Sequence, residues 1–175
     1  MSTLWYFAYG SNMHSGTLRG RRGVDYVRAV AGRLCGWQLV LDKPSLFGVG
    51  GAFANIVPRP SAQVLGVLFE VTEDDLAHIE LTEGVLLRNY ERVAVTVQPL
   101  RPRRAPEVPA VTLVSSRRDP SRLPTQRYMD LLIAGAQEHG LPARYVAALR
   151  RVPTGAESAA EQALRPLLDR LLRRP

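Results

Sequence analysis

The sequence is poor in the residues that form disulfides or bind transition metals. Its 175 residues include one cysteine, Cys35, and three histidines. A single thiol excludes an internal disulfide framework and is typical of a reducing compartment, so we expect a cytoplasmic location. With one thiol and three scattered histidines, a structural zinc site is close to impossible, and we expect no bound metal.

Long apolar runs are also absent. No stretch approaches the ~20 consecutive apolar residues of a membrane-spanning helix. Residues 1–12 lack a basic region ahead of an apolar core, so we expect neither a membrane segment nor a secretory signal. Hydrophobic residues make up 46% of the chain and charged residues 22%, the balance of a globular protein. The length suits one domain with its own core, so we expect a single domain over residues 1–175.

Lysine is almost absent, although the net charge is +7. Only Lys43 among the 23 basic residues is a lysine, and residues 101–127 hold seven arginines against two acidic residues. Such a stretch can bind nucleic acid. Part of it is rich in proline, however, and no aromatic residue lies between Arg101 and Gln126 on which bases could stack. A solvated surface is therefore favoured, and we expect no nucleic-acid partner.

The apolar pattern predicts more strands than helices. Short apolar or alternating runs predict strands at residues 4–9, 37–41, 54–57, 64–71, 91–97 and 110–114, with a proline-containing turn at 58–61. Helices are predicted at residues 13–19, after a capping pattern at residue 72, at 128–139 before Gly140, and at 156–174 with an interruption near Pro166. Strands and helices do not alternate regularly. We therefore predict an α+β domain with a mixed or closed sheet, helices outside it, and a C-terminal helical extension after about residue 152.

The first candidate site is the end of the first predicted strand. Gly10 follows this strand, and Ser11 and Asn12 are good helix N-caps. Backbone N–H groups at the start of a helix lie at the positive end of its dipole and bind carboxylates, phosphates or a developing oxyanion. The alternative is an ordinary strand-to-helix turn with a routine cap.

The second candidate site contains two carboxylates, Glu80 and Glu83, just before Gly84. Apolar neighbours could remove water from such a carboxylate, which raises its pKa toward the range of a general base. The alternative is a surface acid ahead of a helix-ending glycine. The remaining candidates are weaker: His14 is not aimed at Ser11 as a base, and we expect Cys35 to be packed as a small apolar residue and His78 to be exposed.

Four motifs in order resemble the γ-glutamylcyclotransferase family, also called butirosin-G-like or AIG2-like. The resemblance covers roughly residues 4–149. The motifs are Tyr6-Phe7-Ala8-Tyr9-Gly10-Ser11-Asn12-Met13, Gly51-Ala52-Phe53-Ala54-Asn55-Ile56 followed by Val64-Leu65-Gly66-Val67-Leu68, Glu83-Gly84-Val85 with Tyr90, and Tyr128 with Gly135-Ala136, Gly140-Leu141-Pro142 and Tyr145.

The resemblance implies a fold and a site. The family fold is a small closed mixed β-barrel surrounded by helices. Its catalytic acid/base falls on Glu83, and a tyrosine that lines its pocket falls on Tyr128. Its substrate-binding loop falls on Tyr6, Phe7, Ala8, Tyr9, Gly10, Ser11 and Asn12. Glu80 stands where an aspartate is usual, and neither residues 101–104 nor the segment after residue 152 carries a family motif.

The implied reaction is the release of 5-oxoproline from a γ-glutamyl amide. The substrate's α-amine attacks its own γ-carbonyl, so the reaction needs no cofactor, metal or external nucleophile. The partner is thus a small γ-glutamyl substrate, whose leaving group we expect to face the loop at residues 44–50; a homodimer is compatible with this assignment. Two alternatives stay open: the same chemistry on a γ-glutamyl-tagged intermediate of secondary metabolism, and a non-catalytic module that binds an anion.

Overall fold

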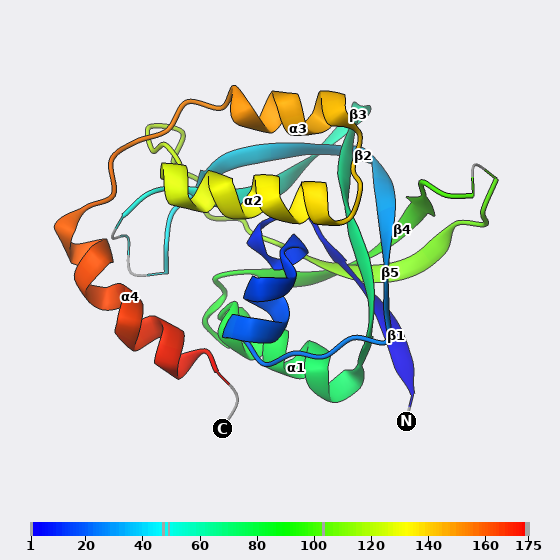
Figure 1. Cartoon of the computed structure of the whole chain (residues 1–175), viewed down its shortest axis with the longest axis horizontal. Coiled ribbons are helices and arrows are strands. Elements are labelled where there is room, and N and C mark those ends of the chain that lie inside the picture. The colour runs from blue at the N-terminus through cyan, green and yellow to red at the C-terminus, as the bar shows by residue number, and fades with distance from the viewer. Residues whose placement is uncertain (1, 47, 49, 103, 174–175) are drawn as a thin grey trace.

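The computed structural model describes residues 2–46, 48, 50–102 and 104–173. Within them five strands close into a barrel in the order β1-β3-β2-β4-β5 (Figure 1). Neighbouring strands are antiparallel except β1 and β5, which are parallel. The strands are β1 (Thr3–Ala8), β2 (Arg28–Lys43), β3 (Phe53–Thr72), β4 (Glu91–Pro99) and β5 (Val108–Val114). The predicted α+β class with a closed mixed barrel is confirmed.

Strand β3 is longer than the sequence indicated. The turn predicted at residues 58–61 is wrong, because β3 continues through it and pairs with β2 on both sides. Between the pairs Cys35↔Gln63 and Trp37↔Pro58, four residues of β3 lie opposite one residue of β2, so the register shifts. The prolines fit this irregular, exposed stretch because regular ladder hydrogen bonds are interrupted at such a bulge.

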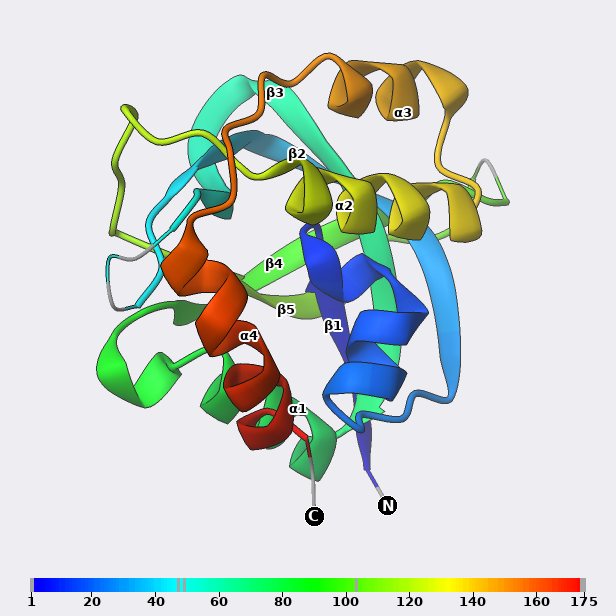
Figure 2. The same cartoon turned by 60° about the vertical axis from the view of Figure 1, so that its left-hand side comes forward.

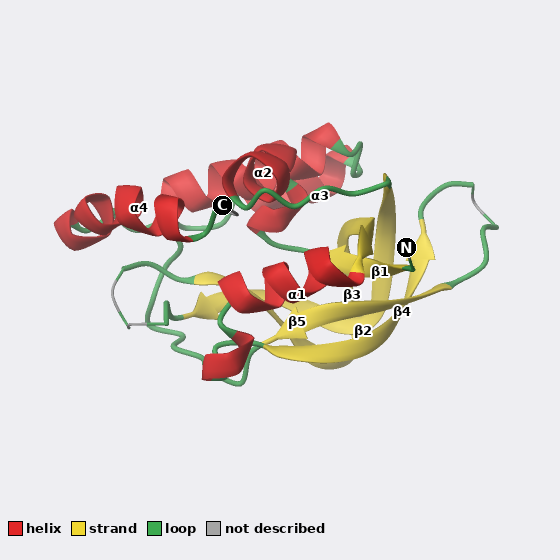
Figure 3. Cartoon of the chain, turned by 90° about the horizontal axis from the view of Figure 1, so that it is seen from below, coloured by secondary structure: helices red, strands yellow, loops and turns green. Residues whose placement is uncertain are grey.

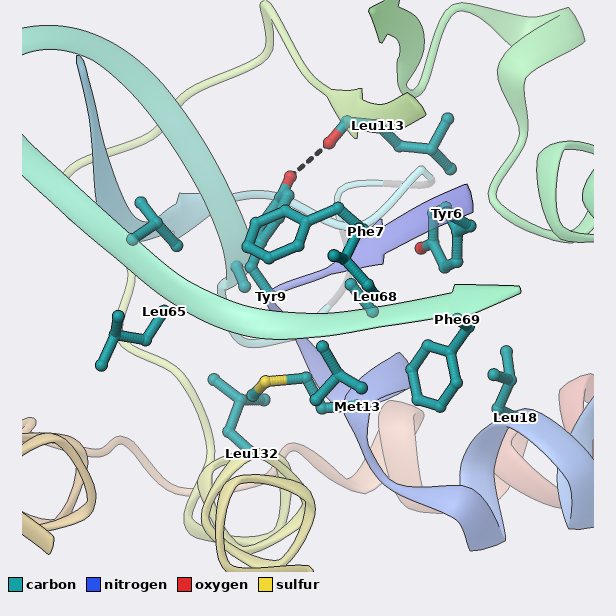
Figure 4. Packing of buried hydrophobic residues seen from close by; sticks show 14 of the residues in the cluster. Tyr6, Phe7, Tyr9, Met13, Leu18, Leu65, Leu68, Phe69, Leu113 and Leu132 are labelled. Carbon is teal, nitrogen blue, oxygen red and sulfur yellow. Dashed lines mark hydrogen bonds between the residues drawn. The ribbon is translucent and has the colours of Figure 1, made fainter. Parts of the chain in front are cut away.

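The core fills the barrel and the space between the barrel and the helices. The last three residues of β1 are all buried, since one face of the strand points into the barrel and the other lies under helices. Phe7 and Phe69 are fully buried, and the Tyr9 hydroxyl donates to the Leu113 carbonyl across the barrel (Figure 4). Cys35, by contrast, is exposed. The prediction that it packs inside is wrong, because side chains alternate along a strand and the neighbouring Leu34 takes the inward position.

Four longer helices surround the barrel. They are α1 (Glu73–Thr82), α2 (Gln126–Glu138), α3 (Ala143–Arg150) and α4 (Ala159–Leu171). Helices α2, α3 and α4 gather on one side of the strands (Figure 3). The predicted cap of α1 is confirmed, since Thr72 Oγ1 accepts a hydrogen bond from the Asp75 N–H at 3.1 Å. The interruption predicted near Pro166 is wrong: α4 is continuous, and its proline lies on an exposed part of the helix. None of the described helices is long and apolar enough to cross a membrane.

The segment after β1 is not the regular helix predicted at residues 13–19. It forms a single 3₁₀ turn, η1 (Ser11–Met13), and a π-helical turn, η2 (Gly16–Arg21). A second 3₁₀ turn, η3 (Val85–Leu87), follows α1. Helix α2 lies so close to η1 that a Cβ atom added at Gly135 would lie 2.6 Å from the backbone nitrogen of His14. This close packing sets the position of the loop at the end of β1.

Replacing Gly135 with alanine should destabilise the protein by roughly 1–3 kcal/mol, since overpacking a rigid contact forces the backbone to shift. Urea unfolding monitored by circular dichroism measures this. The matched control is Gly20→Ala in η2, where an added methyl group meets nothing within 4 Å. This control should leave stability unchanged or raise it by up to about 1 kcal/mol. Equal stability of the two variants would contradict the close contact.

Candidate functional site

A cavity of about 480 Å³ lies between the loop after β1, the end of α1 and helix α4. The structure brings most of the predicted site residues together on its lining, namely Tyr6, Tyr9, Gly10, Ser11, Asn12, Glu83 and Tyr128. Phe7 and Ala8 do not line it, because both side chains are buried in the core. Glu80 lies outside the cavity as well, and its carboxylate lies 3.4 Å from Arg92. The sites at residues 6–12 and 83 are thus parts of one cavity.

The loop at the end of β1 approaches the cavity closely because it contains glycine. A Cβ atom on Gly10 would lie 3.2 Å from the Tyr128 hydroxyl and 3.2 Å from Ala54 Cβ. The next turn, η1, is closed by hydrogen bonds from Met13 N to Gly10 O and from His14 N to Ser11 O. With only three residues, η1 has no extended helix dipole. Any anion-binding capacity here therefore comes from the loop's own polar groups.

Glu83 is the lining carboxylate that contacts the loop after β1; Glu157 and Glu161 line the cavity as well. Glu83 caps the C-terminal end of α1, where Gly84 turns the chain with a φ of 72°. Glu83 Oε1 accepts hydrogen bonds from Asn12 Nδ2 at 2.9 Å and from Arg22 Nη2 at 2.6 Å. The Glu83 side chain is only 19% exposed. Because both bonds end on Oε1, the carboxylate is held in one orientation at the cavity wall.

Arg22 was not found by sequence reasoning. Its side chain is 6% exposed and donates to Glu83, to Asn12 Oδ1 at 2.9 Å and to Thr82 Oγ1. Asn12 Nδ2 in turn donates to the Tyr6 hydroxyl at 3.1 Å. Arg22 follows Arg19 and Arg21 without any motif, so only the three-dimensional structure shows which of these arginines is buried.

Buried tyrosines form much of the inner wall. Burial raises the pKa of Tyr128 to about 12, although hydrogen bonds from the Ala54 N–H and from Ser11 oppose the shift. Burial also raises the pKa values of Tyr6, Tyr9 and Tyr90, and the negative charge of Glu83 raises each of them further. These phenols therefore stay protonated at neutral pH and act as hydrogen-bond donors and acceptors, not as bases.

The chain's one lysine, Lys43, lies in the same cavity. It is 1% exposed, and its ammonium group donates to Asn89 Oδ1 at 2.7 Å and to the Pro44 carbonyl at 2.8 Å. Asn89 also donates to the Glu83 carbonyl at 2.9 Å, which connects the two charged residues. Burial lowers the pKa of Lys43 to about 8; the charge of Glu83 opposes this shift and that of Arg117 adds to it. A lone lysine in an arginine-rich chain was the sequence signal that could have identified it.

The histidines do not serve as a base for Ser11. His14 Nδ1 lies 3.4 Å from Thr17 Oγ1, as expected for a side chain turned away from Ser11. His78, predicted to be exposed, is half-buried, and its Nε2 lies 2.9 Å from the Arg22 carbonyl. Among the described residues, no three His, Cys, Asp or Glu side chains lie close enough together to hold a metal ion.

Comparisons with known proteins agree with this architecture. The AIG2-like family model matches residues 63–149. Gamma-glutamyl cyclotransferase aclK of Aspergillus oryzae is 32% identical over 165 residues, covering 84% of this chain and 60% of the relative's length. A gamma-glutamylcyclotransferase of Bos taurus is 28% identical over 143 residues, covering 80% of this chain and 73% of the relative. A solved structure of a gamma-glutamyl cyclotransferase superposes with a TM-score of 0.77 at 21% identity, covering 97% and 99% of the two chains.

Fold and cavity together define a five-stranded barrel protein with a buried carboxylate beside a glycine-containing loop. The matches above make the chain similar to the AIG2-like family over residues 63–149 and to γ-glutamylcyclotransferases over most of its length. It spans 60% of the length of its Aspergillus oryzae relative.

Replacing Arg22 with methionine should destabilise the protein by about 3 kcal/mol. The substitution removes the ion-pair partner of Glu83 and leaves its carboxylate largely buried and unpaired. The loss should be smaller when Glu83 is already glutamine, since no unpaired charge then stays behind. A double-mutant cycle of Arg22→Met and Glu83→Gln, followed by urea unfolding at pH 7, should give a coupling of about 1–3 kcal/mol. Strictly additive effects would show that the ion pair contributes nothing.

Proposed function

We propose that this protein cyclises a γ-glutamyl amide and releases 5-oxoproline together with a free amine or amino acid. The observation that carries the proposal is the Glu83 carboxylate, fixed through one oxygen at the wall of a cavity that also contains the loop Gly10–Asn12. The names of the two relatives support the same reaction class.

The chemistry follows from the groups in the cavity. The substrate's α-amine forms a bond to its own γ-carbonyl carbon, which closes a five-membered ring, and the bond from that carbon to the leaving nitrogen then breaks. The amine must first lose a proton, because an α-amino group with a pKa of about 8 is largely protonated at neutral pH. Glu83 takes this proton and gives one to the leaving amine. Among the described contacts both hydrogen bonds to Glu83 use Oε1, so Oε2 is the oxygen that faces the substrate.

Lys43 and the glycine-containing loop account for the substrate's α-carboxylate and for the oxyanion that develops during the reaction. Lys43 is buried in the cavity with only a carbonyl and an amide oxygen as its described hydrogen-bond partners, so a carboxylate ligand would supply the missing counter-charge. We assign the substrate's α-carboxylate to Lys43. The backbone N–H groups of Gly10, Ser11 and Asn12 then stabilise the oxyanion that develops on the γ-carbonyl and hold the chain in its ring-closing conformation.

Replacing Glu83 with glutamine should keep the fold and lower turnover by roughly two to four orders of magnitude, the usual scale of general acid–base catalysis. Release of 5-oxoproline from γ-glutamyl amino acids, assayed without added metal, measures this. Glu80→Gln is the matched control: it changes a carboxylate three residues away that lies outside the cavity, and it should retain activity. Near-normal activity of Glu83→Gln would remove the proposed base. If the wild-type protein binds γ-glutamyl amides but releases no 5-oxoproline, a binding module is the better description.

Replacing Lys43 with methionine should lower kcat/KM for a γ-glutamyl amide by roughly 10- to 100-fold, since a charge-assisted hydrogen bond is lost. The comparison substrate is 4-aminobutanamide, which lacks the α-carboxylate and should be cyclised equally by both proteins. In the wild type, kcat/KM for the γ-glutamyl amide should also fall above about pH 8, where Lys43 loses its proton. An undiminished preference for the carboxylated substrate in Lys43→Met would contradict this role.

A further inference from the structure

Helix α4, drawn in orange to red in Figure 2, contributes several residues to the lining of the cavity. No residue of this helix is buried. Polar contacts near both of its ends hold it instead. Glu161 Oε1 accepts from the Gly51 N–H at 2.9 Å, Asp169 pairs with Arg21 at 2.5 Å, and the Leu172 carbonyl just after the helix lies 3.2 Å from His78 Nε2. The apolar side chains of α4 therefore do not anchor it in the core.

These contacts turn one leucine face of α4 toward the cavity. Leu164, Leu168 and Leu171 follow the i, i+4, i+7 spacing of a single helix face, and all three line the cavity. Their exposed fractions are 40%, 37% and 69%. Leu167, at the i+3 position, lies at the edge of this stripe: it does not line the cavity and is 53% exposed.

The opposite wall of the cavity is apolar too. Leu81 at the end of α1 and Leu87 in η3 line the cavity and are 60% and 65% exposed. Together with the α4 leucines they form an apolar cleft at the cavity mouth, which we call the leucine mouth (Leu81, Leu87, Leu164, Leu168 and Leu171). A group of exposed leucines of this kind marks a binding surface, because transferring apolar surface out of water lowers the free energy.

The polarity of the cavity therefore changes along its depth. Its inner part holds Glu83, Arg22 and Lys43, all largely buried. Its more exposed part holds the leucine mouth, and the charged lining residues beside the α4 leucines have partners: Arg165 pairs with Glu157, and Glu161 accepts from the Gly51 N–H. A γ-glutamyl amide also has a charged end and a second end of variable polarity. The glutamyl end carries the ammonium and carboxylate groups, and the leaving amine extends from the other end. With the glutamyl end at Glu83, the leaving amine points outward to α4.

We infer that the leucine mouth is the leaving-group subsite and that this protein selects γ-glutamyl amides whose leaving amine is large and apolar. The inference rests on the proposed function and specifies its substrate class. The loop at residues 44–50, where the sequence placed the leaving group, contributes Ser45 and Leu46 to the lining, and residues 47 and 49 lie outside the described part of the chain. Helix α4, which carries no family motif, supplies the larger apolar share.

The test compares two amides that differ only in apolar length, γ-glutamyl-n-hexylamide and γ-glutamyl-methylamide, on the full-length protein. Release of 5-oxoproline should give a kcat/KM at least about tenfold higher for the hexylamide, since each methylene in an apolar subsite contributes to discrimination. Leu164→Asn and Leu168→Asn should each lower this ratio several-fold, because kcat/KM for the hexylamide falls more than kcat/KM for the methylamide. Leu167→Asn, the same substitution at a leucine of the same helix that does not line the cavity, should leave the ratio at its wild-type value.

The outcomes separate this inference from the proposed function. If both amides are cyclised equally well by the wild type, the leaving-group subsite is rejected and the cyclisation stands. If Leu167→Asn lowers the ratio as much as Leu164→Asn, the effect belongs to helix stability, and the subsite is rejected as well. If neither amide yields 5-oxoproline, the proposed function fails, and the dissociation constants of the two amides decide the subsite: equal values overturn it, and tighter binding of the hexylamide supports it.

Discussion

The candidate site depends on one ion pair. Arg22 and Glu83 come from segments 61 residues apart, and the 2.6 Å hydrogen bond between them connects the turn η2 to the end of α1. Asn12 bonds to both partners, so the glycine-containing loop after β1 is part of the same unit. A buried carboxylate without these donors would be costly. The position of the Glu83 carboxylate and the position of the loop are therefore set by the same few contacts, and neither can change alone.

The barrel makes this arrangement possible by bringing the ends of distant elements together. The second half of strand β1 is buried and ends at the cavity, while β3 leads directly into α1, which Glu83 caps at its C-terminal end. The Tyr90 hydroxyl donates to the Ala54 carbonyl at 2.9 Å, and the Ala54 N–H donates to the Tyr128 hydroxyl at 3.0 Å. These bonds satisfy backbone polar groups of Ala54, whose side chain is buried. The site is thus built from short strand and helix ends on a rigid frame.

Much of this could be predicted, and the exceptions have physical reasons. The loop of Gly10 to Asn12 and Glu83 were predicted because local motifs mark them. Arg22 and Lys43 were not assigned a role, because their importance comes from burial, and burial depends on contacts between segments far apart in the sequence. The length of β3 was missed because prolines usually end strands, and only pairing with β2 shows that they lie in a bulge. The face of α4 that meets the cavity follows from three polar contacts that no periodicity reveals.

The way α4 is attached also bears on how molecules enter and leave. Detaching this helix breaks a few partly hydrated polar contacts and exposes no core, whereas opening the barrel would break long ladders of strand pairing. Segments with few buried contacts open at a much lower free energy than the global unfolding of a protein. Ligand exchange can therefore proceed through excursions of the C-terminal helix while the barrel and its carboxylate stay in place. The helix beside the cavity and the barrel that holds the carboxylate therefore differ in how readily they open.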